Sequence, residues 1–406
     1  MLWSFAYFFC LLAGYYILRP LRDEMGVAGG VRNLQWLFTA TFLTMLAAVP
    51  CYGALVARLP RRRFIPLVYH FFVANLAIFW LLLTLDVERQ TVARVFFVWI
   101  SVFVLFAVSV FWSFMADLYS SEQGKRLYGF IAAGGSAGAL AGPLLTIGLA
   151  QMLGPVNLLI VAALLLEGAV LCAMRLEPRE EIKGKQAVGG GSWDGIMMVL
   201  RSPYIAGIML WVSLMSVAAT FLYFEQAAIV AAASDDPAVR TRIFAAVDLA
   251  VGLLTIAVQF FATGKLIARF GVGAALALLP LVFAAGFAVL AAAPVLAVVI
   301  AFQALQRTAN FAISNPAREV LFTVLARDEK YKAKNVIDIV AVRGADAAGG
   351  WLFTGLRALG MEVRSIPLVA ILLAAACLVL AAALGRAQER RAAQAAGSHN
   401  QGDAHG

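Results

Sequence analysis

Long apolar segments alternate with short polar connections along most of the chain. A helix rises 1.5 Å per residue, so about 20 apolar residues cross the roughly 30 Å hydrocarbon layer of a membrane. Six apolar segments precede a polar stretch that contains Gly189-Gly190-Gly191-Ser192, and six follow it. The predicted spans are 2–18, 34–56, 64–85, 92–115, 127–149, 156–174, 205–233, 243–262, 272–292, 295–313, 336–356 and 366–384. The pattern therefore predicts an all-α polytopic membrane protein with twelve transmembrane helices.

The polar stretch and the chain end divide the sequence into four parts. We predict an N-terminal six-helix half over 1–175, a cytoplasmic linker over 176–202 and a C-terminal six-helix half over 203–386. The tail over 387–406 is rich in Ala, Gln, Gly and His, and we expect it to be disordered.

The two halves repeat at an offset of about 210 residues. The second span ends with Gly-Ala-Leu-Val-Ala-Arg at 53–58, and the eighth is followed by Gly-Lys-Leu-Ile-Ala-Arg at 264–269. Two six-helix halves that repeat in this way resemble the major facilitator architecture. The loop motif of that family has an acid and a glycine where this chain has Ala57 and Pro60.

Composition and charge agree with a membrane protein. The chain is 63% hydrophobic and 14% charged, whereas soluble domains are nearer half apolar and a quarter charged. Lys and Arg concentrate in alternate loops, which predicts an inner-membrane protein with both termini cytoplasmic. The first span departs from this bias, because basic residues follow it and none precedes it. The loop charges account for the net charge of +9, so we expect no nucleic-acid partner.

Four charges arrive within six residues at the end of the first span, namely Arg19, Arg22, Asp23 and Glu24. Charges at membrane depth cost about 2.5–3.5 kcal/mol each on insertion scales. We interpret this stretch as the charged end of a helix that points into a polar cavity. An ordinary external loop with an Arg–Asp pair is the alternative.

Polar side chains also interrupt the spans of the second half. The tenth span carries Gln303, Gln306, Arg307, Asn310 and Ser314, whose spacing places them on one helical face. This stripe favours a water-filled path, and a hydrogen-bonded seam between helices is the alternative. Other polar positions are Glu225 and Gln226 in the seventh span, and Asp248, Thr255 and Gln259 on one face of the eighth. The eleventh span carries Asp338, Arg343 and Asp346, of which Arg343 and Asp346 can pair at a spacing of three residues.

The buried cations indicate the substrate class. Arg19, Arg22, Arg307 and Arg343 are permanently charged and suit bidentate binding of phosphate or carboxylate. Acids such as Asp248 would either neutralise the arginines of an empty site or carry protons. Two hypotheses follow: exchange of organic anions, or proton-coupled transport of another small molecule through Glu225, Asp248 and Asp338.

Other chemistry has little support in the sequence. The four cysteines are isolated, and we find no metal-ligand spacing or phosphate-binding loop, so we expect no cofactor, metal or enzyme activity. Gly134 to Gly138 matches a Gly-x-Ser-x-Gly pattern around Ser136, but it lies in an apolar helix. Gly134, Gly138 and Gly142 recur every four residues, which is typical of close helix packing. For His70 we expect a satisfied core or interfacial role. For Glu167 in the sixth span a partnered structural role and a functional role are the two alternatives.

Several motifs resemble the nucleotide (ATP/ADP) translocase family of plastids and intracellular bacteria. Ile-Leu-Arg-Pro-Leu-Arg-Asp at 17–23 is similar to the end of that family's first helix, although Arg22 stands in place of a lysine. The stretch 121–130, with Glu122 and Lys125, is similar to its Glu-Ala-Lys-Arg-Phe-Tyr segment. Lys-Ala-Lys-Asn-Val-Ile-Asp-Ile-Val at 332–340 resembles its Lys-Gly-Lys-Ala-Ala-Ile-Asp-Val-Val segment. Asp346 stands where the family's eleventh helix has Gly-Lys-Ser-Gly-Gly.

The resemblance implies exchange of ATP-like and ADP-like anions by a monomer, with transport residues at Arg22, Glu122, Glu225 and Lys334 or Arg343. The resemblance and the positions of the charges together define the predicted site residues. The predicted substrate-binding residues are Arg19, Arg22, Arg307, Asn310, Arg343 and Lys334. The predicted coupling or gating residues are Asp23, Glu122, Lys125, Glu225, Asp248, Asp338 and Asp346.

Overall fold

The computed structural model describes residues 1–58, 61–119, 121–176, 201–326, 336–361 and 365–403, with single positions at 197, 199, 329, 330, 333 and 334. The side chains of 51–58, 61–64, 121, 125 and 395–403 are outside this description. Most of the predicted linker and the motif around Ala57 and Pro60 therefore lie outside the described residues.

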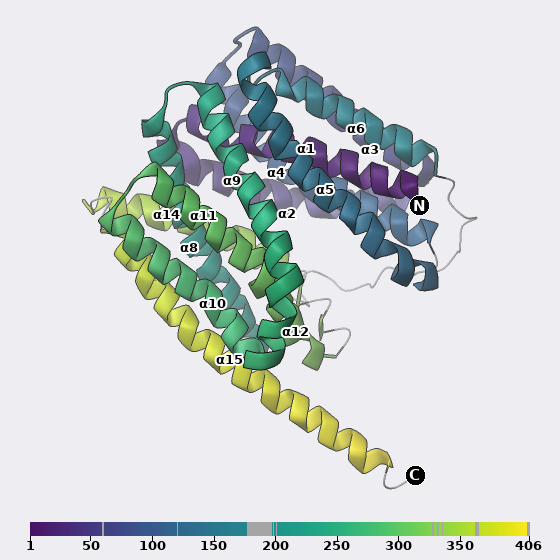
Figure 1. The fold of residues 1–406 in the computed structure, drawn as a ribbon, viewed down its shortest axis with the longest axis vertical. Coiled ribbons are helices and arrows are strands. Elements are labelled where there is room, and N and C mark those ends of the chain that lie inside the picture. Colours follow the sequence, from purple (N-terminus) through teal and green to yellow (C-terminus); the bar gives the residue numbers. More distant parts are fainter. Residues whose placement is uncertain are drawn as a thin grey trace. The chain divides into compact units, whose positions relative to one another are not determined.

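Within the described ranges every regular element is a helix (Figure 1). The elements before the linker are α1 (Leu2–Ala28), η1 (Val31–Asn33), α2 (Leu34–Arg58), α3 (Arg61–Thr84), α4 (Arg89–Leu118), α5 (Ser121–Leu153) and α6 (Leu158–Met174). The elements after it are α8 (Pro203–Ala233), α9 (Pro237–Val258), η2 (Gln259–Thr263), α10 (Gly264–Ala292), α11 (Leu296–Ala309), η3 (Asn310–Ser314), α12 (Asn315–Leu321), η4 (Phe322–Val324), η5 (Val336–Ala341), α14 (Val342–Ala358) and α15 (Ile366–Asp403). Here η2, η3 and η5 are π-helical turns, and η1 and η4 are 3₁₀ turns.

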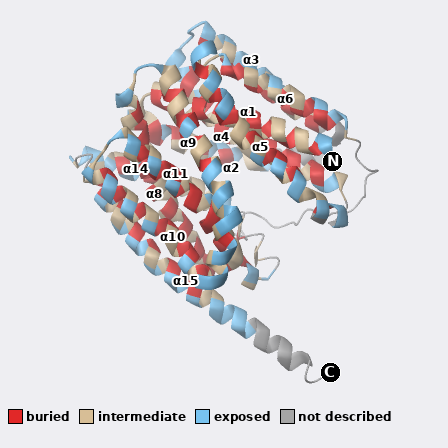
Figure 2. Cartoon of the chain, in the orientation of Figure 1, coloured by how far each residue is buried: buried red, intermediate tan, exposed pale blue. Residues whose placement is uncertain are grey.

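The helices confirm the predicted fold class. Each predicted span coincides with one helix or with a helix extended by a π-helical turn. In the described part of the chain, 8 helical segments are long and apolar enough to cross a membrane, and α6 is a shorter apolar helix. Figure 2 marks the exposed residues along the helices. Many of them carry large apolar side chains, as expected where lipid replaces water.

Three boundaries differ from the prediction. α1 continues ten residues beyond Leu18, because the charges that follow that residue find partners within the fold. The eighth and ninth spans form one helical run that breaks at Gly271, where φ is 78° and a glycine is favoured. α15 continues through residues 387–403, which form most of the predicted tail.

The described chain forms two compact units. Unit 1 contains Met1–Ala187 together with Val230–Gly252, and unit 2 contains Val188–Ile229 together with Leu253–Gly406. Residues 230–252, which comprise the end of α8 and most of α9, thus belong to unit 1 although they follow the linker in sequence. Charged residues of α9 therefore form ion pairs with charged residues of α1 within unit 1.

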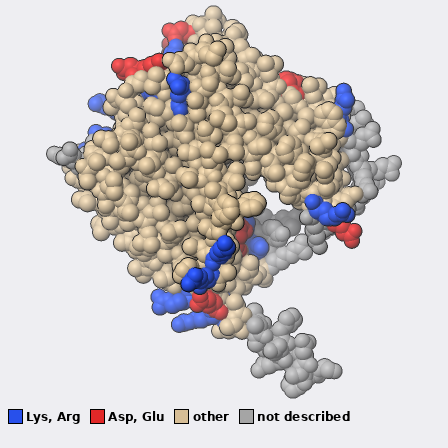
Figure 3. All heavy atoms as spheres, in the orientation of Figure 1, with Lys and Arg blue, Asp and Glu red and all other residues tan. Residues whose placement is uncertain are grey.

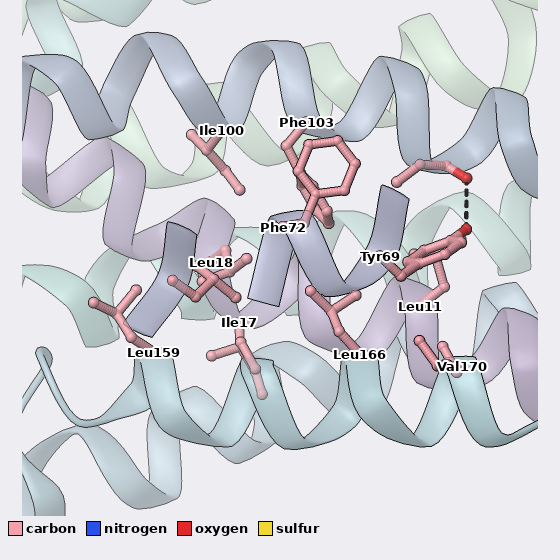
Figure 4. Packing of buried hydrophobic residues seen from close by; sticks show 14 of the residues in the cluster. Leu11, Ile17, Leu18, Tyr69, Phe72, Ile100, Phe103, Leu159, Leu166 and Val170 are labelled. Carbon is pink, nitrogen blue, oxygen red and sulfur yellow. Dashed lines mark hydrogen bonds between the residues drawn. The ribbon is translucent and has the colours of Figure 1, made fainter. Parts of the chain in front are cut away.

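The core of unit 1 lies among α1, α3, α4 and α6 (Figure 4). Leu11 and Ile17 of α1 are fully buried there, as are Leu159 and Leu166 of α6. The hydroxyl group of Tyr69 on α3 donates a hydrogen bond of 2.9 Å to the carbonyl oxygen of Ala107 on α4. The hydroxyl group of Tyr7 on α1 in turn donates a hydrogen bond of 2.9 Å to that of Tyr69, so polar contacts tie three helices together inside a largely apolar core.

α1 and α5 approach each other closely through glycines. A Cβ atom added at Gly134 would lie 2.5 Å from the carbonyl oxygen of Phe5, and one at Gly142 would lie 2.7 Å from that of Ala13. This confirms that the predicted glycine face is a packing surface. Ser136 lies within the same helix and donates to the carbonyl group four residues earlier, so the strand–turn–helix geometry of an esterase elbow does not form here.

His70 and Glu167 lie beside each other on α3 and α6. The Nε2 atom of His70 is 3.4 Å from Oε2 of Glu167, and both side chains are more than a third exposed. Its other ring nitrogen is 2.7 Å from the carbonyl oxygen of Pro66. Glu167 therefore has a partner, which agrees with the structural alternative.

Candidate functional site

The charged end of α1 pairs with α9 inside unit 1. Nη1 of Arg19 lies 3.1 Å from Oδ1 of Asp248, and the two side chains are 16% and 1% exposed. Both residues were predicted as site residues, and the structure brings them together. An acid buried this deeply beside an arginine neutralises the charge of that arginine, which is the arrangement expected of an empty anion site.

A second ion pair joins the same two helices. Nη2 of Arg240 donates to Oε1 of Glu24 at 2.8 Å, and both side chains are nearly buried. Nη1 of Arg240 donates to the carbonyl oxygen of Ser234 at 3.1 Å. Sequence reasoning missed this pair, because Arg240 was counted among loop charges. Glu24, an acid at the end of the first span, was the one sequence feature that could have suggested a basic partner.

The order of the two pairs shows that α1 and α9 run antiparallel along this contact. Arg19 and Glu24 are five residues apart on α1, and their partners Asp248 and Arg240 follow in the opposite direction on α9. The helices are thus held at two points about 7–12 Å apart along their axes, by the rise of 1.5 Å per residue.

Arg22 has different partners from Arg19. Its Nε and Nη2 atoms lie 3.0 and 2.6 Å from Oδ1 of Asp23, and its guanidinium group lies over the ring of Phe97 at 5.1 Å. The Arg–Asp pair that belonged to the loop alternative is present, but both residues lie within helix α1. Stacking on an aromatic ring holds the guanidinium plane in place.

In unit 2 the polar stripe of the tenth span has two parts. Nε2 of Gln303 donates to Oε1 of Gln226 on α8 at 2.8 Å, and both side chains are buried. This part forms a hydrogen bond between helices, which was the alternative to a water path. Arg307 and Asn310, further along, keep partial exposure at the junction of α11 and η3.

The π-helical turns at this level hydrogen-bond to each other. Oγ1 of Thr263 in η2 donates to the carbonyl oxygen of Ala312 in η3 at 2.7 Å. Nε2 of Gln259 lies 3.4 Å from the carbonyl oxygen of Phe311. π-Helical turns often occur at functional sites, and these two adjoin the predicted substrate residue Asn310. Gln259 and Asp248, predicted on one face, thus serve different partners.

Glu225 is buried in the middle of unit 2. The residue is 2% exposed, and its Oε1 atom accepts no hydrogen bond from the described residues. A buried carboxylate without such bonds is costly when charged, so it favours a proton or a charged ligand.

α14 carries a predicted pair that the structure confirms. Nη1 of Arg343 donates to Oδ2 of Asp346 at 3.2 Å, and Oδ1 of the same acid accepts a hydrogen bond of 2.5 Å from Ser216 on α8. The hydroxyl of Ser216 also lies 3.3 Å from the carbonyl oxygen of Val342. Ser216 was not predicted, because an isolated serine in an apolar span gives no pattern.

Lys334 and Asp338 have partners on α12. Nζ of Lys334 is 2.8 Å from both carboxylate oxygens of Glu319, and Nη1 of Arg318 is 3.1 Å from Oδ1 of Asp338. These four residues form two neighbouring ion pairs, both of which involve α12. The structure therefore places Lys334 and Asp338 in ion pairs with residues of α12.

Two predicted residues at the start of α5 remain, Glu122 and Lys125. Glu122 is exposed in the first turn of α5. The side chain of Lys125 lies outside the described residues.

Comparisons with known proteins agree on the family. The family model of the Major Facilitator Superfamily matches residues 3–234. No curated protein sequence matches the chain. The nucleoside transporter NupG, solved as a mutant, is similar in structure with a TM-score of 0.68 and 11% identity, over 94% of this chain and 98% of that one.

Two further solved structures show the same fold. A POT family peptide transporter in an auto-inhibited form has a TM-score of 0.66 and 13% identity, over 96% of both chains. A bacterial homologue of the iron transporter ferroportin, in an inward-facing state, has a TM-score of 0.63 and 12% identity, over 93% of this chain and 97% of that one. At these identities the likeness concerns the fold. Since the family model covers more than half of the chain and the helical fold agrees with it, the chain belongs to the major facilitator superfamily of membrane transporters.

Proposed function

We propose that this transporter exchanges organic anions, of a nucleotide-like class, by antiport across the inner membrane with both termini in the cytoplasm. The observation that carries the proposal is the ion pair between Arg19 and Asp248, at 3.1 Å with the acid 1% exposed. An arginine inside a membrane helix is costly, so its presence there points to a functional site, and its guanidinium group matches phosphate and carboxylate.

The substrate anion replaces the acid on the arginine. In this step Arg19 exchanges the carboxylate of Asp248 for a phosphate or carboxylate group of the substrate. Losing one partner of a buried pair costs about 3–5 kcal/mol, so the exchange requires further contacts of the substrate or a separation of α1 from α9 that lets water reach Asp248. Anion binding is thereby coupled to loosening of the contact between the two helices.

The same geometry explains why transport should be an exchange. Two ion pairs, at Arg19 and at Glu24, hold α1 against α9 inside unit 1. An empty carrier keeps both pairs and stays in one arrangement, whereas a loaded carrier has lost the first. Each return step therefore needs a substrate anion, which is the definition of antiport.

Unit 2, taken by itself, also carries cationic and amide side chains that suit an anion. Arg307 and Asn310 lie partly exposed where α11 meets η3, and Arg343 is oriented by Asp346, which Ser216 in turn holds. The nucleotide-like character rests on the motif resemblance, because the likeness to NupG concerns the fold and the other similar structures are named for peptide or iron transport.

An efflux experiment tests the coupling directly. Liposomes containing purified protein are loaded with labelled ATP and diluted into buffer with or without unlabelled nucleotide. The wild type should release label only into nucleotide, whereas Asp248→Asn, with the pair weakened, should also release it into empty buffer. Asp86→Asn, in the exposed pair with Arg89, is the matched control and should behave as the wild type. Strict exchange by Asp248→Asn at the wild-type rate contradicts the proposal.

Proton-coupled transport of another small molecule is the second candidate, and Glu225 favours it. This acid is buried and Oε1 accepts no hydrogen bond from the described residues, which suits a proton carrier. Uptake that collapses with an uncoupler and is lost in Glu225→Gln would support this candidate over anion exchange.

A further inference from the structure

A basic surface lies in unit 2 where α10 and α15 meet at one end of the bundle. It comprises Lys265 and Arg269 on α10 with Arg386 and Arg390 on α15, all exposed. Figure 3 shows Lys and Arg side chains gathered around the end of the structure at which α15 continues. None of these four residues was assigned to the transport site.

The packing of the two helices brings the cations together. α10 and α15 cross where a Cβ atom on Gly385 would lie 2.5 Å from Cα of Gly273. One turn further, a Cβ atom on Gly271 would lie 3.4 Å from Oε1 of Glu389. Arg269 is two residues from Gly271, and two residues extend at most about 7 Å. Arg269 of α10 and Arg390 of α15 therefore both lie near Glu389, and Arg386 lies one helical turn before Arg390.

The charges are arranged as two like-charged pairs. Lys265 and Arg269 are four residues apart on α10, and so are Arg386 and Arg390 on α15. Like charges at this spacing lie on one face and repel each other within a helix. Among the described residues, no carboxylate forms an ion pair with Arg269, Arg386 or Arg390. A bound anion would relieve this repulsion.

Apolar side chains continue each basic pair toward the membrane span. On α15, Leu372 and Val379 precede Arg386 at intervals of seven residues, so they share its face, and each is 70% exposed. In η2, which leads into α10, Phe261 lies four residues before Lys265 and is 72% exposed. α15 thus presents an exposed apolar stripe that changes to arginine, and the exposed Phe261 of η2 precedes the basic pair of α10.

We propose that this surface binds the headgroup of an anionic phospholipid. The phosphate group contacts Arg269, Arg386 and Arg390, and the acyl chains lie along the exposed apolar side chains that precede them. A soluble phosphate ion would use the cations alone and would gain nothing from those apolar side chains. The lipid therefore accounts for both features, by charge attraction and by burial of apolar surface.

Lipid retention measured by native mass spectrometry tests this site without any transport assay. Full-length protein in detergent is titrated with phosphatidylglycerol or with phosphatidylcholine. The wild type should retain phosphatidylglycerol preferentially. The variant Arg269→Gln/Arg386→Gln/Arg390→Gln should bind it more weakly by about fivefold for each removed cation, or roughly 100-fold in all. Lysine at the same three positions should restore most of the binding.

A variant that removes three exposed arginines elsewhere, Arg32→Gln/Arg89→Gln/Arg357→Gln, is the matched control and should retain phosphatidylglycerol. Equal retention by the site variant and the wild type overturns the proposal. Equal loss in the control variant shows only a general charge effect and also overturns it. Displacement of the lipid by inorganic phosphate would identify a soluble anion as the occupant and would contradict the lipid assignment.

Discussion

The contact between Arg19 and Asp248 gives the sharpest stability prediction. Replacing Arg19 with glutamine removes the cation that lies 3.1 Å from a carboxylate that is 1% exposed. Breaking a buried ion pair from one side costs about 3–5 kcal/mol. Because the side chain of Arg19 keeps 16% exposure, we take the lower end, about 3 kcal/mol. The unfolding entropy of 406 residues, at about 2.1 cal/mol/K for each residue, converts this loss to a Tm decrease of about 3–4 °C.

Thermal unfolding of the purified protein in detergent measures this loss. The double variant Arg19→Gln/Asp248→Asn should recover part of it, because the buried acid has become neutral, and a coupling energy of about 2 kcal/mol is expected. Arg89→Gln is the control: its pair with Asp86 is 48% and 73% exposed and should matter by less than about 1 kcal/mol. Equal Tm changes for Arg19→Gln and Arg89→Gln would refute the argument that burial gives the first pair its strength.

Three shorter predictions follow from the packing and the buried polar groups. Gly138→Ala should destabilise by about 1–3 kcal/mol in the same unfolding assay, because its methyl group meets the backbone of α1, whereas Gly148→Ala has no neighbour within 4 Å and should be neutral or stabilising. Thr263→Val should cost about 1 kcal/mol, since it removes the 2.7 Å hydrogen bond to η3; an unchanged Tm would show that this bond adds no stability. Glu225→Gln should slow but not abolish nucleotide exchange under the antiport proposal, measured as counterflow, because the acid serves there as a charge partner or gate; a complete loss would favour the proton-coupled candidate.

Hydropathy was sufficient to predict the fold. Apolar runs fix where membrane helices lie, and the repeat at an offset of about 210 residues indicates the two-half architecture. The boundaries were less accessible. The first predicted span ended where charges began, yet α1 continues to Ala28, because those charges find partners on α9 and beside themselves. A composition pattern cannot register a partner that lies more than two hundred residues away.

The candidate site was predictable in part for the same reason. Charges within a span are conspicuous, so Arg19, Asp248 and the pair of Arg343 with Asp346 could be selected from sequence. Their partners were not all conspicuous. Arg240 resembles an ordinary loop arginine, and Ser216 resembles many serines in apolar helices, until packing places each beside an acid. Local sequence patterns identify charged residues within apolar spans, but only the tertiary structure identifies the partners that stabilise them.

Counterflow in liposomes tests the central claim, that the transporter exchanges nucleotide-like anions. Protein is reconstituted, the liposomes are loaded with unlabelled ATP, and uptake of labelled ADP is followed with and without an uncoupler. The account predicts uptake that requires internal nucleotide, resists the uncoupler, and falls strongly in Arg22→Ala/Arg307→Ala. Absence of uptake, or uptake that this double variant leaves unchanged, would contradict it.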